Sequence, residues 1–239
     1  MRSVYSKCRL ALIAIVEASV TNIPGGLGRT IRRAYWRRRL KHMGVGVHID
    51  IGVRIINPQY VSIGDNAWID NYVIILAGPH VSRGGPIYVK RNADFIGAPG
   101  EVVIGSNAHI ANFVVLQGHG GVLIGNDVTI ASGSKLYSMS HHHSNMSDRL
   151  DSRKFKFSSL APGEEQSLIL GAIVVCSEAA VGLNSILLPG VCVGRGSWVA
   201  AGSVLSWSIP DNVLVAGNPA VVVKPQLHPG WVPEVKPNG

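Results

Sequence analysis

The sequence predicts an all-β fold, in which a solenoid of short parallel strands follows a helical arm. Three observations lead to this prediction. Aliphatic residues recur at every sixth position, a period that suits neither a helix, at 3.6, nor an isolated strand, at 2. Small residues recur four positions after many of them, and glycine or asparagine marks the turns between them. The 239 residues suffice for one large domain or two small ones.

Residues 1–44 form the predicted arm, a basic amphipathic helical segment. They hold ten of the 22 lysines and arginines but only one of the 14 acidic residues, Glu17. The run LALIAIVEASV is too short to span a bilayer, which takes roughly 20 apolar residues, and the basic run RTIRRAYWRRRLK follows it. This pattern favours a helix or helix pair on an anionic membrane surface. A helical cap packed on the domain is the alternative, and nucleic acid is disfavoured because no motif for it is present.

The repeats come next, in three blocks. One hexapeptide makes one strand and its corner, and successive coils stack at about 4.8 Å. The aliphatic residue is expected to point inward, while the small residue fits where the wall turns. Glycine and asparagine in IGDN, IGSN and IGND adopt backbone angles that other residues resist. The expected inward residues are Val45, Ile51, Ile63, Ile69 and Ile75; Ile104, Ile110, Leu116, Ile124, Ile130 and Leu136; and Ile169, Val175, Val181, Leu187, Val193, Val199 and Leu205.

A polar insertion interrupts the count after the hexapeptide LYSMSH, in which Leu136 points inward and His141 stands at the corner. We expect an inserted loop over residues 142–167, so that His141 stays on the rigid wall while His142 and His143 begin the loop. A catalytic group works best on a scaffold, with a loop forming the walls of the site. Imidazole is largely neutral at cellular pH and can remove a proton from a hydroxyl group. His141 is therefore the candidate general base, and His143 is its rival.

The repeats carry a resemblance. The segments IGDNAWID, IGSNAHIANFVV, IGNDVTIASGSKL and VGLNSILLPGVCVGRGSWVAAGSV resemble the hexapeptide-repeat acyltransferases. The similarity covers roughly residues 45–224 and leaves 225–239 as a tail. It implies a left-handed parallel β-helix with three hexapeptides per coil, and a homotrimer with sites between subunits. The handedness comes from the resemblance alone, because parallel crossovers are otherwise right-handed in nearly all proteins. The segment IPGGLGRTIRRAYWRRRLKHMG is similar to the arm of polysaccharide O-acetyltransferases of the colanic-acid and O-antigen type.

The resemblance also implies roles for single residues. LYSMSH is similar to the IYTATH of sugar acetyltransferases, whose histidine is the general base, and to the DHxH form of the polysaccharide enzymes, with Ser140 in place of the usual aspartate. IANFVV is similar to a segment whose asparagine contacts the acceptor, which implies an acceptor site at Asn112 and His143. For Asn112, a corner asparagine that satisfies its own turn is the alternative. The ending AAGSVLSWSIPDNVLVAGNPAVVVK implies coenzyme A contacts at Ala201, Ser206 and Lys224.

The implied function is O-acetyl transfer from acetyl-CoA to a sugar hydroxyl in surface polysaccharide biosynthesis. The expected acceptor is a sugar or a nucleotide- or lipid-linked saccharide. No nucleophilic Ser or Cys motif is visible, which favours direct transfer in a ternary complex. One alternative is an N-acetyltransferase acting on an amino nucleotide sugar, and another is a non-catalytic, membrane-associated β-helix scaffold.

No metal is expected. The carbonic anhydrases that share this tube bind zinc, but His109 and His119 do not reproduce the spacing of their ligands, and His141 and His142 are adjacent. The three cysteines lack metal-like spacing and no cleavable signal is evident. These features favour the cytoplasm, with peripheral contact to the inner membrane.

Overall fold

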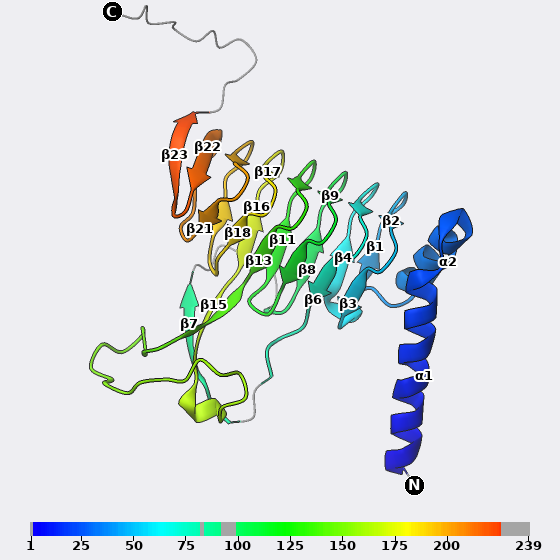
Figure 1. Ribbon diagram of the computed structural model, residues 1–239, viewed down its shortest axis with the longest axis horizontal. Coiled ribbons are helices and arrows are strands. Elements are labelled where there is room, and N and C mark those ends of the chain that lie inside the picture. Colours follow the sequence, from blue (N-terminus) through cyan, green and yellow to red (C-terminus); the bar gives the residue numbers. More distant parts are fainter. Residues whose placement is uncertain (1, 82–83, 92–98, 226–239) are drawn as a thin grey trace, which may run out of the picture.

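The computed structural model describes residues 2–81, 84–91 and 99–225. Two helices come first, α1 (Arg2–Asn22) and α2 (Gly25–Arg37), and strands joined by turns make up most of the rest. Figure 1 shows the helices at one end of a row of stacked coils and the last strands at the other end. The chain is therefore mostly β structure with a helical arm, as predicted.

Three parallel sheets form the walls of the coils, and the chain visits them in turn. Sheet A contains β1 (His42–Met43), β4 (Val61–Ile63), β8 (Val102–Ile104), β11 (Val122–Ile124), β16 (Ile173–Val175) and β19 (Cys192–Val193). Sheet B contains β2 (His48–Ile49), β5 (Trp68–Ile69), β9 (His109–Ile110), β12 (Thr129–Ile130), β17 (Ala180–Val181), β20 (Trp198–Val199), β22 (Val213–Gly217) and β23 (Ala220–Pro225). Sheet C contains β3 (Arg54–Ile56), β6 (Ile74–Leu76), β10 (Val115–Gln117), β13 (Lys135–Tyr137), β18 (Ile186–Leu187) and β21 (Val204–Leu205).

We number the coils 1 to 6 along the chain, from β1–β2–β3 to β19–β20–β21, and name the corners AB, BC and CA after the sheets they join. The hairpin of β22 and the antiparallel β23 ends sheet B, so that the last coil does not leave a flat parallel edge there. The first coil begins at His42, slightly before the predicted boundary at residue 45.

The core is a set of aliphatic ladders inside the coils. In sheet C each inward residue pairs in register with the next, and all of them are at most 2% exposed. The members of this ladder are Ile55, Ile75, Leu116, Leu136, Leu187 and Leu205. Burial of this apolar surface, at about 25 cal/mol per Å², stabilises each coil only when its neighbours are present. The predicted inward positions in residues 104–136 and 175–205 are confirmed.

The predicted register of the first block is wrong at its start. Val45 is 71% exposed, and the inward residues of coil 1 include Ile49 and Ile55 instead. The reason is a longer corner, because the 3-10 turn at Pro58–Tyr60 adds residues between coils 1 and 2. A six-residue count extended backward from Ile63 through that corner therefore falls out of phase. The count also begins too early in the last block, because Ile169 lies outside the coils.

The corner sequences divide two tasks between glycine and asparagine. A Cβ on Gly64 would lie 2.6 Å from the backbone nitrogen of Ser106 in the next coil, so this position requires close approach. Asn66 and Asn107 carry the left-handed backbone, with φ of 54° and 56°, which asparagine tolerates better than most residues. In these corners, asparagine therefore makes the turn and glycine allows the coils to stack.

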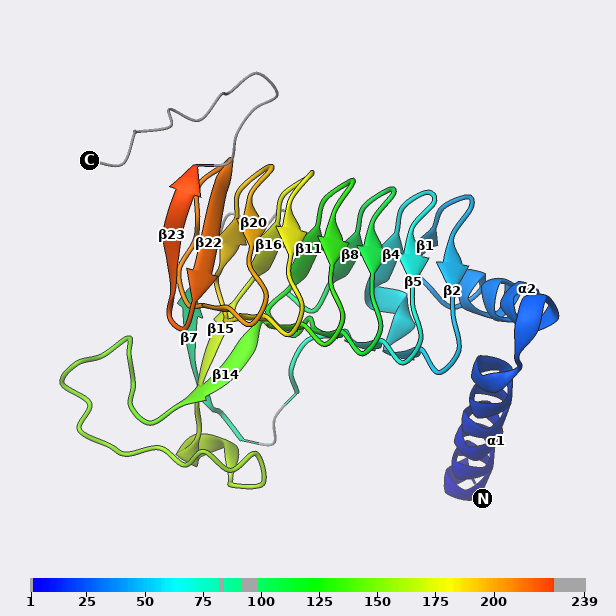
Figure 2. The same cartoon turned by 45° about the horizontal axis from the view of Figure 1, so that its top comes forward.

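The two helices of the arm have different relations to the coils. α2 lies over coil 1, where Trp36 is fully buried and the 2% exposed Arg32 donates to the carbonyl oxygen of Ile49 at 2.9 Å. Burial lowers the pKa of Arg32, since it removes the guanidinium from water. α1 projects away from the coils (Figure 2). Among the described helices, none combines the length and apolar character needed to cross a membrane.

Candidate active site

Two insertions leave the coils at the CA corner. The first follows β6 and contains β7 (Ile87–Arg91); the second follows β13 and contains β14 (Met139–His142) and β15 (Ser167–Gly171). β15 pairs with β14 antiparallel and with β7 in parallel, so the insertions share one small sheet, sheet D. Figure 2 shows this sheet beside the coils. The first insertion was not expected from the sequence. The second begins at Met139 rather than at residue 142.

His141 therefore lies on β14, opposite Leu168, and not at the coil corner as predicted. The corner residue is Ser138, which is fully buried. Its hydroxyl donates to the carbonyl oxygen of Gln117 at 2.5 Å and accepts from the amide of Gly120 at 2.9 Å. The side-chain oxygen of Gln117 accepts from the amide of Met139 at 2.8 Å. These bonds anchor the start of β14 to coils 3 and 4, so His141 still projects from a rigid support.

The structure brings two further histidines to His141, and the sequence pattern predicts a role for neither. His80 comes from the first insertion, and His119 comes from the CA corner between coils 3 and 4. The rings of His80 and His119 lie 5.8 Å apart at 72°, and His80 interacts electrostatically with His119 and His141. We call His80, His119 and His141 the histidine cluster. No six-residue pattern could have revealed it, because the first insertion carries no repeat.

Hydrogen bonds orient two members of the histidine cluster. His119 donates through Nδ1 to the carbonyl oxygen of Gly78 at 2.9 Å, so its Nε2 is unprotonated when the ring is neutral. Nδ1 of His80 lies 3.1 Å from the hydroxyl of Tyr88 on β7. By contrast, Nε2 of His141 is enclosed and has no hydrogen-bond partner within the described part of the chain. A buried polar atom without a partner is costly and is a frequent mark of a functional site.

The surroundings of His80 favour its neutral form. Burial lowers the pKa of His80, and the neighbouring His119 and His141 lower it further, because a second positive charge nearby is unfavourable. Burial also raises the pKa of Tyr88, so this side chain remains a neutral phenol. The site therefore offers imidazole lone pairs, which suits proton abstraction.

A pocket of about 460 Å³ adjoins the cluster. Its walls come from both insertions, with His80 and Val81 on one side and Ser159, Leu160 and Gln166 among the residues on the other. Within the described residues, no group of three or more His, Cys, Asp or Glu side chains has an arrangement that could hold a metal ion.

The triple histidine divides into separate environments. His142 contacts Ser144 through Nδ1 at 3.0 Å, and its ring lies 4.5 Å from that of His143. His143 lies beyond β14, is exposed, and accepts through its carbonyl oxygen from the amide of Phe155 at 2.9 Å. Among the described contacts, none joins His143 to the histidine cluster.

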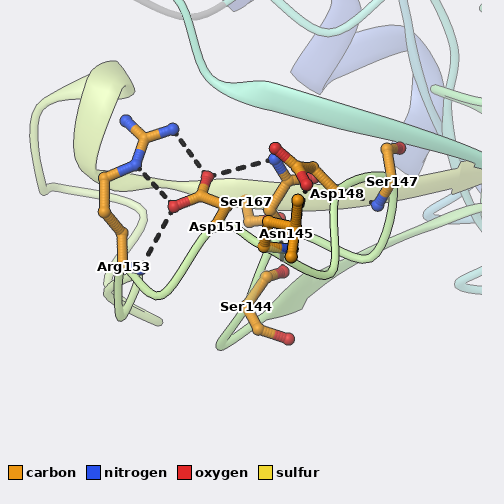
Figure 3. Close-up of polar contacts among 8 residues, drawn as sticks. Ser144, Asn145, Ser147, Asp148, Asp151, Arg153 and Ser167 are labelled. Carbon is orange, nitrogen blue, oxygen red and sulfur yellow. Dashed lines mark hydrogen bonds and ion pairs between the residues drawn. The ribbon is translucent and has the colours of Figure 1, made fainter.

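The loop after His143 is braced by Asp151. This carboxylate accepts two hydrogen bonds from the side chain of Arg153, at 2.8 and 2.7 Å, and one from Asn145 at 3.1 Å (Figure 3). These contacts hold the pKa of Asp151 well below its usual range. Lys156 in turn pairs with Glu165 at 2.6 Å. Two of the basic side chains in the loop are thus engaged with carboxylates of the same insertion.

Asn112 lies at the BC corner, before β10, whereas His141 follows β13 beyond the CA corner. Since β10 and β13 are neighbours in sheet C, these two residues stand at opposite ends of the same wall. The side-chain oxygen of Asn112 accepts from the amide of Asn71 at 3.1 Å, as a corner asparagine should. A single chain therefore does not bring Asn112 to the histidine cluster.

The three residues implied for coenzyme A lie toward the C-terminal end of the coils. Ala201 and Ser206 flank β21, at the BC and CA corners respectively, and both are exposed. Lys224 is on β23, at the edge of sheet B, and is also exposed. Ser206 therefore lies at the CA corner, from which the strand of His141 leaves the coils, and it is two strands further along sheet C. Ala201 shares the corner of Asn112.

Comparisons with known proteins extend this description. No family model matches the chain. WbbJ of Escherichia coli, assigned as a lipopolysaccharide biosynthesis O-acetyl transferase, is 31% identical over 131 residues, 54% of this chain and 63% of that protein. A 2,3,4,5-tetrahydropyridine-2,6-dicarboxylate N-acetyltransferase of Clostridium perfringens is 43% identical over 51 residues, 21% of this chain and 22% of that protein. The matches thus span less than two thirds of these relatives.

Solved structures share the fold. AntD, an N-acyltransferase from Bacillus cereus in complex with dTDP and 3-hydroxybutyryl-CoA, superposes with a TM-score of 0.64 at 22% identity, covering 82% of this chain and 88% of that one. A maltose O-acetyltransferase from Clostridium difficile gives 0.53 at 16%, covering 88% and 83%. A hexapeptide-repeat containing acetyltransferase from Vibrio cholerae, complexed with acetyl coenzyme A, gives 0.51 at 20%, covering 87% and 82%. The predicted resemblance to the hexapeptide-repeat acyltransferases is therefore confirmed, in partial sequence similarity and in shared fold.

Proposed function

We propose that this chain is an acetyl-CoA-dependent acetyltransferase that modifies a sugar, with His141 as general base. The observation that carries the proposal is the enclosed, unpartnered Nε2 of His141, which interacts with the ring of His80 at the wall of a pocket. An acceptor hydroxyl bound there would supply the missing hydrogen-bond partner. The similarity to acetyltransferases supports the choice of reaction.

The reaction is direct transfer in a ternary complex. The acceptor oxygen attacks the thioester carbonyl carbon while His141 takes the hydroxyl proton. The tetrahedral intermediate then collapses, the carbon–sulfur bond breaks, and the imidazolium returns the proton to the coenzyme A thiolate. A positioned base contributes typically 10²–10⁴-fold, and holding both substrates together supplies much of the remainder.

The acceptor is proposed to be a hydroxyl group of a sugar in surface polysaccharide assembly. The similarity to WbbJ, which is assigned to lipopolysaccharide biosynthesis as an O-acetyl transferase, supports this choice. The second candidate is an amino group on a nucleotide sugar. It is supported by AntD, an N-acyltransferase that has been solved in complex with dTDP-4-amino-4,6-dideoxyglucose and coenzyme A.

We place coenzyme A along the CA corner, from Ser206 toward His141. Lys224 lies on β23 at the edge of sheet B, which does not border this corner, and it is proposed to meet the phosphates beyond the last coil. Strands in a sheet are about 4.8 Å apart, so Ser206 lies about 10 Å along the coil axis from the corner of His141. An exposed lysine suits a phosphate as a point charge. Ala201 lies at the other corner and would reach coenzyme A only from a neighbouring copy of the chain.

The proposed assembly is a homotrimer with sites between subunits, built from coils that wind left-handed as the resemblance implies. The implied site residues support it, because they fall into two columns. Ser206 lies at the CA corner, and His141 lies on the strand that leaves the coils there. Asn112 and Ala201 lie at the BC corner. A neighbour that sets its BC corner against the CA corner would complete the site. The BC corner exposes the stacked rings of Tyr72 and Phe113, 51% and 60% exposed, together with Leu183, and such an apolar stripe favours contact between proteins.

The location proposed is the cytoplasmic side of the inner membrane, with α1 as the contact. Leu12 and Ile15 on this helix are 62% and 63% exposed, and the arm that contains them is strongly basic. Apolar side chains among basic residues suit an anionic lipid surface.

The test is a thiol-release assay with the full-length chain, acetyl-CoA and a panel of sugars and nucleotide sugars. His141→Ala should lower turnover by about 10²–10⁴-fold, with an unchanged circular dichroism spectrum and mass. His143→Ala is the matched control in the same histidine run, and it should retain activity. Release of the product acetyl group by hydroxylamine would identify an ester, whereas an amide would resist.

Two outcomes would overturn the proposal. The first is a His141→Ala variant that turns over at the wild-type rate. The second is a wild-type chain that releases no thiol with any acceptor, which would favour the scaffold alternative.

A further inference from the structure

A second pocket lies on the wall of the coils that does not border the CA corner. It opens on sheet B between coils 2 and 3, where β5 and β9 pair in register. Its volume is about 480 Å³, and its lining is Asn66, Trp68, Asp70, Asn107, Ala108 and His109. The proposed reaction uses none of these residues. We call this hollow the Trp68 pocket.

Trp68 forms a fixed aromatic wall. Its indole Nε1 donates to a carboxylate oxygen of Asp50 at 2.9 Å, and the ring of His48 stacks on it with centroids 5.0 Å apart. The side chain is nevertheless 43% exposed. His48 belongs to coil 1, whereas the pocket is lined by coils 2 and 3. The side of the indole that faces the pocket is therefore the one away from His48.

The polar groups around this wall are mainly hydrogen-bond acceptors that are already oriented. His109 contacts Asp70 through Nε2 at 2.9 Å, and it is 45% exposed. With the carboxylate accepting there, Nδ1 of the neutral ring is an acceptor. The second oxygen of Asp70 has the same capacity. Asn66 and Asn107 add amide groups that can both donate and accept.

The charges around the pocket disfavour an anion. The guanidinium of Arg29 lies 5.8 Å from the centroid of the Trp68 ring, but its charge is compensated by Asp50 at 3.4 Å. Asp70 is paired only with His109 among the described contacts, so this side of the pocket has acidic character. A phosphate, a nucleotide or an acidic sugar would meet a carboxylate without a fixed cation, which costs binding free energy. A neutral ligand with many hydroxyl groups meets acceptors that it can satisfy.

We propose that the Trp68 pocket binds a neutral pyranose unit of a glycan. The apolar C–H face of the sugar would pack on the indole, as aromatic side chains favour. Its hydroxyl groups would donate to Asp70 and His109, since hydrogen bonds to a charged acceptor are the stronger ones. The pocket is thus a sugar site on a different wall from the histidine cluster. It requires neither acetyl-CoA nor a catalytic His141.

The experiment is a titration of the full-length protein with four neutral hexasaccharides, cellohexaose, maltohexaose, mannohexaose and galactohexaose, followed by isothermal calorimetry without acetyl-CoA. At least one should bind the wild type with a Kd of about 0.1–1 mM. Trp68→Ala should weaken this binding at least tenfold, whereas Trp68→Phe, which keeps an aromatic ring, should retain most of it. Trp198→Ala is the matched control, because Trp198 occupies the same outward position of sheet B and is 49% exposed.

The proposal is overturned if no neutral hexasaccharide binds up to about 10 mM, well above that range, or if Trp68→Ala binds like the wild type. Stronger binding of hexagalacturonate would contradict the neutral specificity. A changed mass of Trp68→Ala in light scattering would instead identify this wall as a contact between copies, and it would also overturn the proposal. Because His141→Ala should bind the hexasaccharide normally, a failure of the proposed acetyl transfer leaves this result distinct.

Discussion

At the scale of single residues, three imidazoles from separate segments meet, and among the described residues none of the three is paired with a carboxylate. Ser140, which stands where the resemblance implies an aspartate, is exposed, and its hydroxyl donates to the carbonyl oxygen of His141 at 3.5 Å. Other groups orient the imidazole rings. The carbonyl oxygen of Gly78 holds the ring of His119, and the hydroxyl of Tyr88 holds the ring of His80. The neighbouring His119 and His141 lower the pKa of His80, because a second positive charge close by is unfavourable.

The lowered pKa of His80 makes a prediction about stability. In the unfolded chain His80 titrates near 6.5, so between that value and its lower folded pKa the unfolded state binds more protons. The free energy of unfolding should therefore fall as pH falls below about 6.5. His80→Gln removes this dependence.

The measurement is urea unfolding of wild type and His80→Gln at about pH 7.5 and pH 5.5, on either side of the ordinary histidine pKa. The stability of the wild type relative to the variant should decrease at the lower pH. A difference between the two proteins that stays constant with pH would contradict the assignment. Tyr88, His119 and His141 face the same ring and are present in both proteins.

At the scale of elements, the basic arm was expected either to cap the coils or to contact a membrane surface. We assign these two roles to different helices. α2 is a cap, because Trp36 and Arg32 are buried against coil 1. α1 is tied to α2 chiefly through Glu17, which accepts from the hydroxyl of Tyr35 at 2.9 Å and lies 3.5 Å from Arg39. It leaves Leu12 and Ile15 exposed. α1 is therefore the helix that we propose contacts a lipid surface.

We predict that Leu12→Ser together with Ile15→Ser weakens sedimentation with phosphatidylglycerol vesicles by about tenfold or more. Burying an aliphatic side chain contributes about 1.5–3 kcal/mol, and each factor of ten is about 1.4 kcal/mol. Val45→Ser, which changes an exposed apolar residue outside the arm, should sediment like the wild type. Wild-type binding that is equal for phosphatidylglycerol and uncharged phosphatidylcholine would contradict the role given to the basic residues.

At the scale of the whole molecule, the coils place side chains at regular intervals along their axis. Every coil repeats the same three corners, so residues at one corner line up along the axis whatever their separation in sequence. Ser138, from which the strand of His141 leaves the coils, and Ser206 belong to one such column, and Asn112 and Ala201 belong to another. Within one chain a wall of sheet C separates the columns, which is why the proposed site needs a second copy.

This arrangement predicts complementation between inactive variants. His141→Ala and Asn112→Ala should each be strongly impaired alone. If unfolded together in equal amounts and refolded, they should recover about one quarter of wild-type activity, because in a closed ring that fraction of interfaces pairs two intact corners. Activity that stays at the level of the separate variants would place both residues of a site in one chain. Light scattering of the mixture checks that the assembly is intact.

The repeats made much of this fold predictable. A period of six with inward Ile110, Leu136 and Val199 follows from the need of each short strand to bury one side chain per coil. The errors arose where a corner has a different length, as at Pro58–Tyr60, because periodicity carries register only while the spacing holds. His141 could be found from its place at the end of a count. His80 and Tyr88 could not, because they lie in a segment without a period.

The sequence by itself therefore determined the stacked parallel coils, the basic arm and the candidate His141, since each depends on local spacing or composition. The tertiary structure alone decided that the two insertions share sheet D, that His80 and His119 meet near His141, and that Trp68 forms a pocket with His109. The physical reason is that such contacts join residues tens of positions apart. Pairing of the inserted strands leaves no periodic trace in the chain. The period of six indicates that the coils stack, but it does not indicate which outward side chains then meet.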